Sequence, residues 1–304
     1  MSSVPLAAPK RRLPGSMQLA NFVQRQGVLC ALALLIVFGA LRYDNFLSTY
    51  NVWSVLRFNS MFGLIALGMT FVIMTGGIDL SVGAVAAFAS VIAALLSPYG
   101  LVPAVGGALL GGTVLGLING FVIARLKLLP FVATLAMLLG ARGLALVFAG
   151  NHSVSVDPAS GFVADFGQGE LLGVPIPVII LVAAYGSGWV VLGYTQYGRH
   201  VLAVGGNEEA SRLMGLRVER LLITAYTVNG LLASVVVGGT LLTGGLGSVA
   251  ATLVGVLLLG LILNILNFEN GRGFISLSAY WQSVIRGAFL LVVVVLQNRL
   301  AQRR

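Results

Sequence analysis

The sequence predicts an all-α membrane protein, a polytopic bundle of about nine helices that each supply the roughly 20 apolar residues needed to cross a bilayer. Hydrophobic residues make up 58% of the 304 residues and charged residues only 9%. Soluble domains carry roughly 45–50% apolar and about 25% charged residues. The basic residues also gather at the ends of the apolar stretches, where topology signals lie in membrane proteins.

The apolar stretches give the expected helices in chain order. A basic, proline-containing tail occupies residues 1–26, and we expect it in the cytoplasm because Lys and Arg favour that side. The transmembrane domain follows over 27–298, and a short basic tail over 299–304 ends the chain. The candidate spans are 27–45, 59–76, 80–97, 101–124, 129–149, 174–194, 221–243, 247–267 and 279–297.

One span carries a stripe of glycines at three- to four-residue spacing, between Gly107 and Gly120. Small residues at this spacing let two helices approach closely. We therefore expect span 101–124 to be buried within the bundle.

Charge predicts the side on which each connection lies. The connection at Arg125 and Lys127 is basic, as is the long connection 195–220, so both are expected on the cytoplasmic side with the N-terminus. The connection 150–173 contains no Lys or Arg and is expected outside; its acidic residues are Asp157, Asp165 and Glu170.

A helix interruption is expected where the apolar run 66–75 meets Gly76 and Gly77, followed by Asp79, one of only nine acidic residues. A carboxylate at or near the membrane is costly and marks a functional site by default. It could orient the interrupted helix near a pathway by accepting hydrogen bonds from Ser81 or the next amides. Alternatively, Asp79 is a plain N-cap of span 80–97.

A short amphipathic helix is expected after Asn207 in the basic connection. Asn207 can cap it, Glu208 and Glu209 lie in a first turn that favours acidic residues, and Gly215 can end it. Its apolar residues would face a partner protein, or it is an ordinary interfacial helix with a solvated charged face. These apolar residues are Leu213, Met214 and Leu216.

No cofactor or metal is expected in this chain. A phosphate-binding P-loop needs a lysine after its last glycine, and the only lysines, Lys10 and Lys127, lie in other settings. The single cysteine, Cys30, and the distant His152 and His200 offer no metal site.

Four stretches in sequence order resemble the permease subunits of ribose-type bacterial sugar ABC importers, the galactofuranose-type permeases in particular. The first is GLIALGMTFVIMTGGIDLSVGAVAAFASVIAA, from Gly63. The second is Asn119–Pro130 with FVATLAMLLGARG, and the third is YGRHVLAVGGNEEASRLMGLRV. With the fourth, VVVGGTLLTGGLGSV, they cover most of Asn45–Leu296.

The resemblance implies a multi-pass inner-membrane permease, not an enzyme, that passes a monosaccharide such as galactofuranose or ribose. ATP and Mg would be held by a separate ABC ATPase subunit, and the other partners would be a periplasmic sugar-binding protein and a second permease copy or related permease. The segment 195–220 would couple to the ATPase, with Glu209, Ala210, Ser211 and Gly215 matching the coupling helix of such importers.

Neutral side chains could pass a sugar, because hydroxyls pair with neutral donors and acceptors. Each threonine within a span is more often a helix-packing residue, whereas an asparagine in hydrocarbon needs a partner. The candidate pathway residues are Thr70, Asn119, Thr134 and Asn229.

Relative to the family pattern, about thirty residues are absent at Ala233 and Ser234, roughly one crossing helix with its loop. The family plan of about ten helices would become nine. Either 221–243 folds as a compressed hairpin, or the last two helices are inverted, or the chain is a non-functional remnant. An ion-coupled secondary transporter is the alternative from another class, because a Gly-Gly break beside Asp79 also suits an ion site.

Overall fold

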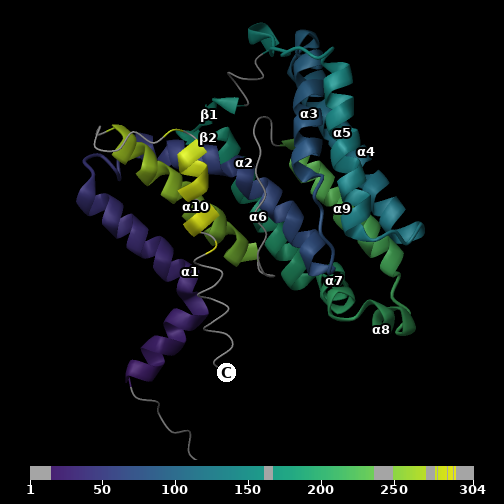
Figure 1. The fold of residues 1–304 in the computed structure, drawn as a ribbon, viewed down its shortest axis with the longest axis horizontal. Helices are drawn as coiled ribbons and strands as arrows, with labels where there is room; N and C mark the ends of the chain where they lie inside the picture. The colour runs from purple at the N-terminus through teal and green to yellow at the C-terminus, as the bar shows by residue number, and fades with distance from the viewer. Residues whose placement is uncertain are drawn as a thin grey trace, which may run out of the picture. The chain divides into compact units, whose positions relative to one another are not determined.

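The computed structural model describes residues 15–160, 167–235, 249–271, 278, 280–285, 287–289 and 291, and these are mostly helical (Figure 1). Short 3₁₀ turns occupy Ser97–Tyr99 and Pro158–Ser160, and a two-stranded antiparallel hairpin pairs β1 (Glu170–Leu171) with β2 (Val174–Pro175). The helices are α1 (Gly15–Arg42), α2 (Thr49–Met74), α3 (Val82–Leu96), α4 (Leu101–Arg125), α5 (Pro130–Phe148), α6 (Ile176–Tyr194), α7 (Gln196–Gly206), α8 (Glu208–Leu213), α9 (Val218–Val235) and α10 (Val249–Gly271).

Within the described residues, six helices are long and apolar enough to cross a membrane. They lie in α2, in α3 with the following turn, in α4, in α5, in α6 and in α10, and a shorter apolar segment lies in α1. The predicted class, a polytopic helical membrane protein, is therefore confirmed.

The predicted spans agree with α3 to α6 within a few residues, but two helices begin earlier than expected. Helix α1 starts at Gly15 and not at 27, and α2 starts at Thr49 and not at 59. The Ser48 hydroxyl accepts the amide of Asn51 at 3.3 Å and so caps α2. The last predicted span, 279–297, lies largely outside the described residues.

Helix α9 contradicts one proposed explanation of the shortened C-terminal half. Residues 221–235, the greater part of the candidate hairpin 221–243, form one continuous helix. At 1.5 Å per residue, what remains before 243 is too short for a second helix across a core of about 30 Å. The compressed hairpin is therefore wrong, and the segment 236–248 lies outside the described residues.

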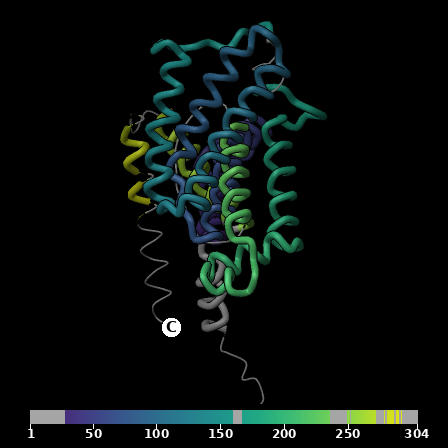
Figure 2. The backbone as a smooth tube through the Cα atoms, turned by 90° about the vertical axis from the view of Figure 1, so that its right-hand side faces the viewer, coloured from purple at the N-terminus to yellow at the C-terminus, as the bar shows by residue number. Residues whose placement is uncertain are grey.

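The chain forms two compact units, residues 45–260 and residues 1–44 with 261–304. In the larger unit, α3, α4, α5 and α9 run side by side, α2 packs between α6 and α9, and the short α7 and α8 lie at one end (Figures 1 and 2). In the smaller unit, the Tyr43 hydroxyl donates to Glu269 at 2.6 Å and its ring stacks on Phe268.

The closest helix pair is α4 with α9, and glycines make this approach possible. A Cβ on Gly116 would lie 2.5 Å from the Tyr226 carbonyl oxygen, and a Cβ on Gly120 would lie 2.7 Å from Ile223 Cα. The opposite face of α4 is exposed, with Leu110 and Phe121 prominent. We expected span 101–124 to be buried within the bundle, but the larger part of it is exposed in the structure, because only its glycine face packs.

We predict that Gly116→Ala destabilises the protein, because the added methyl meets the α9 backbone, which cannot move aside as a flexible side chain can. Overpacking of this kind costs roughly 1–3 kcal/mol. The control is Gly106→Ala in the same helix, where a Cβ has no described atom within 4 Å beyond its own helix. Thermal unfolding in detergent should show a lower midpoint for Gly116→Ala only, and equal midpoints would contradict this packing.

Candidate functional site

The Gly-Gly pair ends α2. The Gly77 amide donates to Val72 O at 3.2 Å and the Gly76 amide to Ile73 O at 2.9 Å, the two bonds of a Schellman C-cap. Gly76 has a φ of +83°, the left-handed conformation that this motif requires and that side chains disfavour. The predicted interruption is thus a helix end followed by a separate helix, α3, and both helices pack on α9.

The carboxylate of Asp79 is buried and fully bonded in the link between these two helices. Its Oδ1 accepts the Ser81 amide at 2.8 Å and the Ser81 hydroxyl at 2.6 Å. Its Oδ2 accepts the side-chain amide of Asn229, in α9, at 2.8 Å. Only 2% of Asp79 is exposed, so these three donors replace water around the charge.

A second amide joins this group from α4. Asn119 Nδ2 donates to Ser81 Oγ at 2.9 Å, so one hydroxyl donates to the carboxylate and accepts from an asparagine. All four residues are at most 2% exposed. We call Asp79, Ser81, Asn119 and Asn229 the carboxylate cluster, which connects the link after α2 to both α4 and α9.

The cluster combines features of both interpretations of Asp79. Helix α3 begins at Val82, but Ser81 before it has helical backbone angles and makes no side-chain cap bond. Asp79 Oδ1 instead accepts the Ser81 amide, two residues ahead, as an N-cap side chain does. It accepts hydrogen bonds from Ser81, as the first interpretation expected, and it also reaches α9. Its role beside a transport pathway stays a prediction.

Tyr226 is a member of the site that sequence reasoning missed. It is fully buried, and its hydroxyl donates to Ile78 O at 3.3 Å, beside the Asp79 carboxylate. Tyr226 precedes Asn229 by three residues on α9 and therefore shares its helix face. This spacing of two polar groups within an apolar span was the available signal.

The two candidate threonines lie outside the carboxylate cluster. Thr70 Oγ1 donates to Ala66 O at 2.8 Å and lies 3.0 Å from Thr252 Oγ1 in α10. Thr134 Oγ1 donates to Pro130 O at 2.8 Å within its own helix. Both are buried, which agrees with a packing role.

Helix α8 has the caps that its sequence predicted. Asn207 Oδ1 accepts the Ala210 amide at 2.9 Å. At the other end, Gly215 has a φ of +83°, and bonds from the Gly215 amide to Arg212 O and from the Leu216 amide to Ser211 O complete a second Schellman motif. The first turn carries Glu208 and Glu209.

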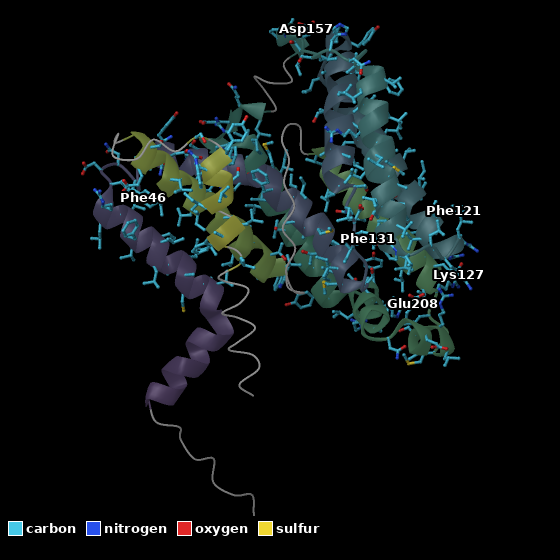
Figure 3. All side chains as sticks on the ribbon, in the orientation of Figure 1. Phe46, Phe121, Lys127, Phe131, Asp157 and Glu208 are labelled. Atoms are coloured by element: carbon cyan, nitrogen blue, oxygen red, sulfur yellow. The ribbon has the colours of Figure 1, made fainter. Side chains whose placement is uncertain are left out.

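Two exposed apolar side chains stand among charged ones at the C-terminal end of α8. Leu213 is 86% exposed and Met214 is 70% exposed. Leu216, which we expected on the same surface, instead packs against the core of the unit, because the Schellman turn folds it back. Glu208 and Lys127 lie at one end of the unit, opposite Asp157 (Figure 3), so the basic connections share an end and the acidic connection lies at the other.

Ion pairs at this end join α4 to α9 and α8 to α9. Glu219, in the first turn of α9, lies 3.1 Å from Arg125 and 4.0 Å from Arg212, which also pairs with Glu208 at 2.8 Å. Such exposed pairs contribute only about 0–1 kcal/mol each to stability.

Within the part of the chain that the structure describes, no group of three or more His, Cys, Asp or Glu side chains could hold a metal ion. The polar groups of the larger unit instead form a buried hydrogen-bonded cluster and an exposed ion-paired end. Together with the apolar helices, they define a polytopic membrane protein.

The comparisons place this protein in a family. Residues 51–242 match the family model described as the branched-chain amino acid transport system / permease component. The chain belongs to this permease family, whose members are transport proteins, not enzymes. No solved structure matches the chain.

Several named relatives cover nearly the whole chain. The ribose import permease protein RbsC of Bacillus subtilis is 37% identical over 309 residues, covering 91% of this chain and 94% of the relative. RbsC of Escherichia coli is 33% identical over 314 residues, covering 91% and 95%. The L-arabinose ABC transporter permease protein AraH of Azospirillum brasilense is 32% identical over 332 residues, covering 98% and 94%.

We predict that Asp79→Leu strongly destabilises the protein and that Asp79→Asn does not. Leucine would leave the Ser81 amide and the Asn229 amide unpaired, and each buried unpaired donor costs roughly 1–3 kcal/mol. Asparagine keeps an acceptor for Ser81. If the Asn229 side-chain amide turns over, its Oδ1, which has no partner among the described residues, can accept the new amide at residue 79. Thermal unfolding in detergent tests this, and an unchanged midpoint for Asp79→Leu would contradict it.

Proposed function

We propose that this protein is the membrane-spanning permease subunit of an ABC importer that carries a monosaccharide across the bacterial inner membrane. The observation that carries the proposal is the match to ribose and arabinose permeases over more than nine-tenths of the chain. Ribose, arabinose and galactofuranose are the candidate substrates. The likeness to galactofuranose-type permeases in particular stays a prediction.

The neutral amides near the carboxylate cluster suit a sugar substrate. Asn119 and Asn229 supply donors and acceptors that can pair with hydroxyls without a net charge. In the conformation described here, both amides are buried and bonded within the protein. A role in the pathway therefore requires a second conformation in which α4 and α9 separate from the 79–81 link.

Energy for transport would come from an ABC ATPase on a separate chain, which would bind ATP and Mg. Helix α8 is the proposed contact, because Leu213 and Met214 are largely exposed at the basic end of the unit. Exposed apolar side chains held in a capped helix are typical of a protein interface. The residues assigned to this contact are Asn207, Glu208, Glu209, Ala210, Leu213 and Gly215.

The charge distribution supports an orientation. The end with Lys127 and α8 would face the cytoplasm, as would the N-terminus, and the end with Asp157 and the β1–β2 hairpin would face the periplasm. The periplasmic end would receive a sugar-binding protein. A second permease copy, or a related permease, would complete the pathway.

A shortened C-terminal half is part of the proposal. The alignment with the Bacillus subtilis permease is 309 positions long, yet it includes only 91% of the 304 residues of this chain. The alignment therefore contains gaps in this chain. This supports a segment in the relative that has no counterpart here. Since 221–243 is not a compressed helical hairpin, two alternatives remain: the last two helices are inverted, or the chain has lost transport. Ion-coupled transport is not proposed, because the relatives are named as importer permeases.

Uptake in cells tests the function and the topology together. We expect ATP-dependent uptake of labelled ribose, arabinose or galactofuranose when the chain is co-expressed with a matching ATPase and binding protein. A reporter that is active on only one side of the membrane, placed after Arg304, gives the side of the C-terminus. Absence of uptake for all three sugars, with the protein present in the membrane, would contradict the proposed function.

We predict that Leu213→Glu weakens co-purification with the ATPase at least about tenfold, the loss expected when a buried apolar anchor worth over 1 kcal/mol is removed. The matched control is Leu172→Glu in the hairpin at the opposite end, where Leu172 is 97% exposed. That variant should retain the ATPase. Equal retention by both variants would reject α8 as the contact.

A further inference from the structure

The backbone of α7 lies directly against the turn that ends α2. A Cβ on Gly205 would overlap the Met74 carbonyl oxygen and lie 3.0 Å from Met74 C and 3.4 Å from Thr75 C. From the other side, a Cβ on Gly76 would lie 3.9 Å from Gly205 Cα and from Gly205 O. Two backbones therefore meet here with no side chain between them.

This contact lies between the proposed ATPase contact and the carboxylate cluster. On one side, α7 ends at Gly206, and the next residue, Asn207, caps α8. On the other side, the turn at Gly76 leads within three residues to Asp79, whose carboxylate bonds α9. The Tyr226 hydroxyl also bonds this segment, at Ile78 O.

We propose that Gly205 is a positioning residue that transmits a displacement of α8 to the 75–81 link, and so to the hydrogen bonds of the carboxylate cluster. This inference rests on the proposed role of α8 as the ATPase contact. Close-packed elements move as units and do not deform continuously. A shift of α7 must therefore shift the turn against which its backbone lies.

The neighbouring glycine provides a control of the same chemistry. A Cβ on Gly206 would have no described atom within 4 Å beyond its own helix. Gly205→Ala and Gly206→Ala thus add the same methyl to adjacent residues of one helix. Only the first pushes α7 away from α2.

The test uses the full chain reconstituted with its ATPase and binding protein in lipid vesicles. Gly205→Ala should retain ATPase co-purification and ATP hydrolysis but lower the sugar transported per ATP by about tenfold, within the usual range of coupling factors. Gly206→Ala should match the wild type in all three measurements. Unchanged transport per ATP in Gly205→Ala, or an equal loss in Gly206→Ala, would overturn the proposal.

Two further results separate this inference from its premise. If Leu213→Glu keeps the ATPase, α8 is not the ATPase contact, and the proposed transmission through Gly205 fails with it. If Leu213→Glu loses the ATPase while Gly205→Ala transports normally, only the transmission through Gly205 fails. If Gly205→Ala does not accumulate in membranes, amide hydrogen exchange of the wild-type complex tests the proposal instead. Addition of ATP should change the protection of backbone amides in 72–81 and in 197–207 together. A change in one segment alone would overturn the proposed transmission.

Discussion

The buried carboxylate of Asp79 is the constraint on which the larger unit depends. A charge taken out of water must be surrounded by donors, and the chain supplies them from Ser81 and from Asn229 on α9, with Asn119 on α4 supporting Ser81. Those amides reach the link where α4 and α9 approach closely, along the glycine face of α4 and at Gly230 of α9. The packing of α4 and α9 and the hydrogen bonding of the buried carboxylate therefore depend on each other in this protein. Separation of the helices would remove the donors from the carboxylate.

Local pattern predicted those parts of the fold that depend on nearby residues. The bounds of α3 to α6 follow from apolar length, and the caps of α8 follow from Asn207 and Gly215, because each needs contacts only within one or two turns. The early start of α2 escaped prediction because Asn51 and Arg57 interrupt its apolar run; Arg57 is accommodated by pairing with Glu170, far away in sequence.

The site was predicted as residues and not as an arrangement. Asp79, Asn119 and Asn229 were selected because polar groups are costly in an apolar environment, and Ser81 as a hydrogen-bond donor to Asp79. No local signal paired Asp79 with an amide in a helix 150 residues away. Leu216 was placed on the wrong side for the same reason, and Tyr226 was passed over although its spacing from Asn229 gave a signal. Both depend on tertiary contacts, Tyr226 with the 76–79 link and Leu216 with the core.

Helix α2 is anchored at both of its ends. Near its start, Arg57 is held 3.1 Å from Glu170 of the β1–β2 hairpin, and at its end the Gly76 turn lies against α7. A 26-residue helix is a rod of about 39 Å. If such a rod tilted about its middle, its two ends would swing in opposite directions, and with them the hairpin contact and the α7 contact. A tilt of α2 would therefore couple these two contacts without any change within the helix itself.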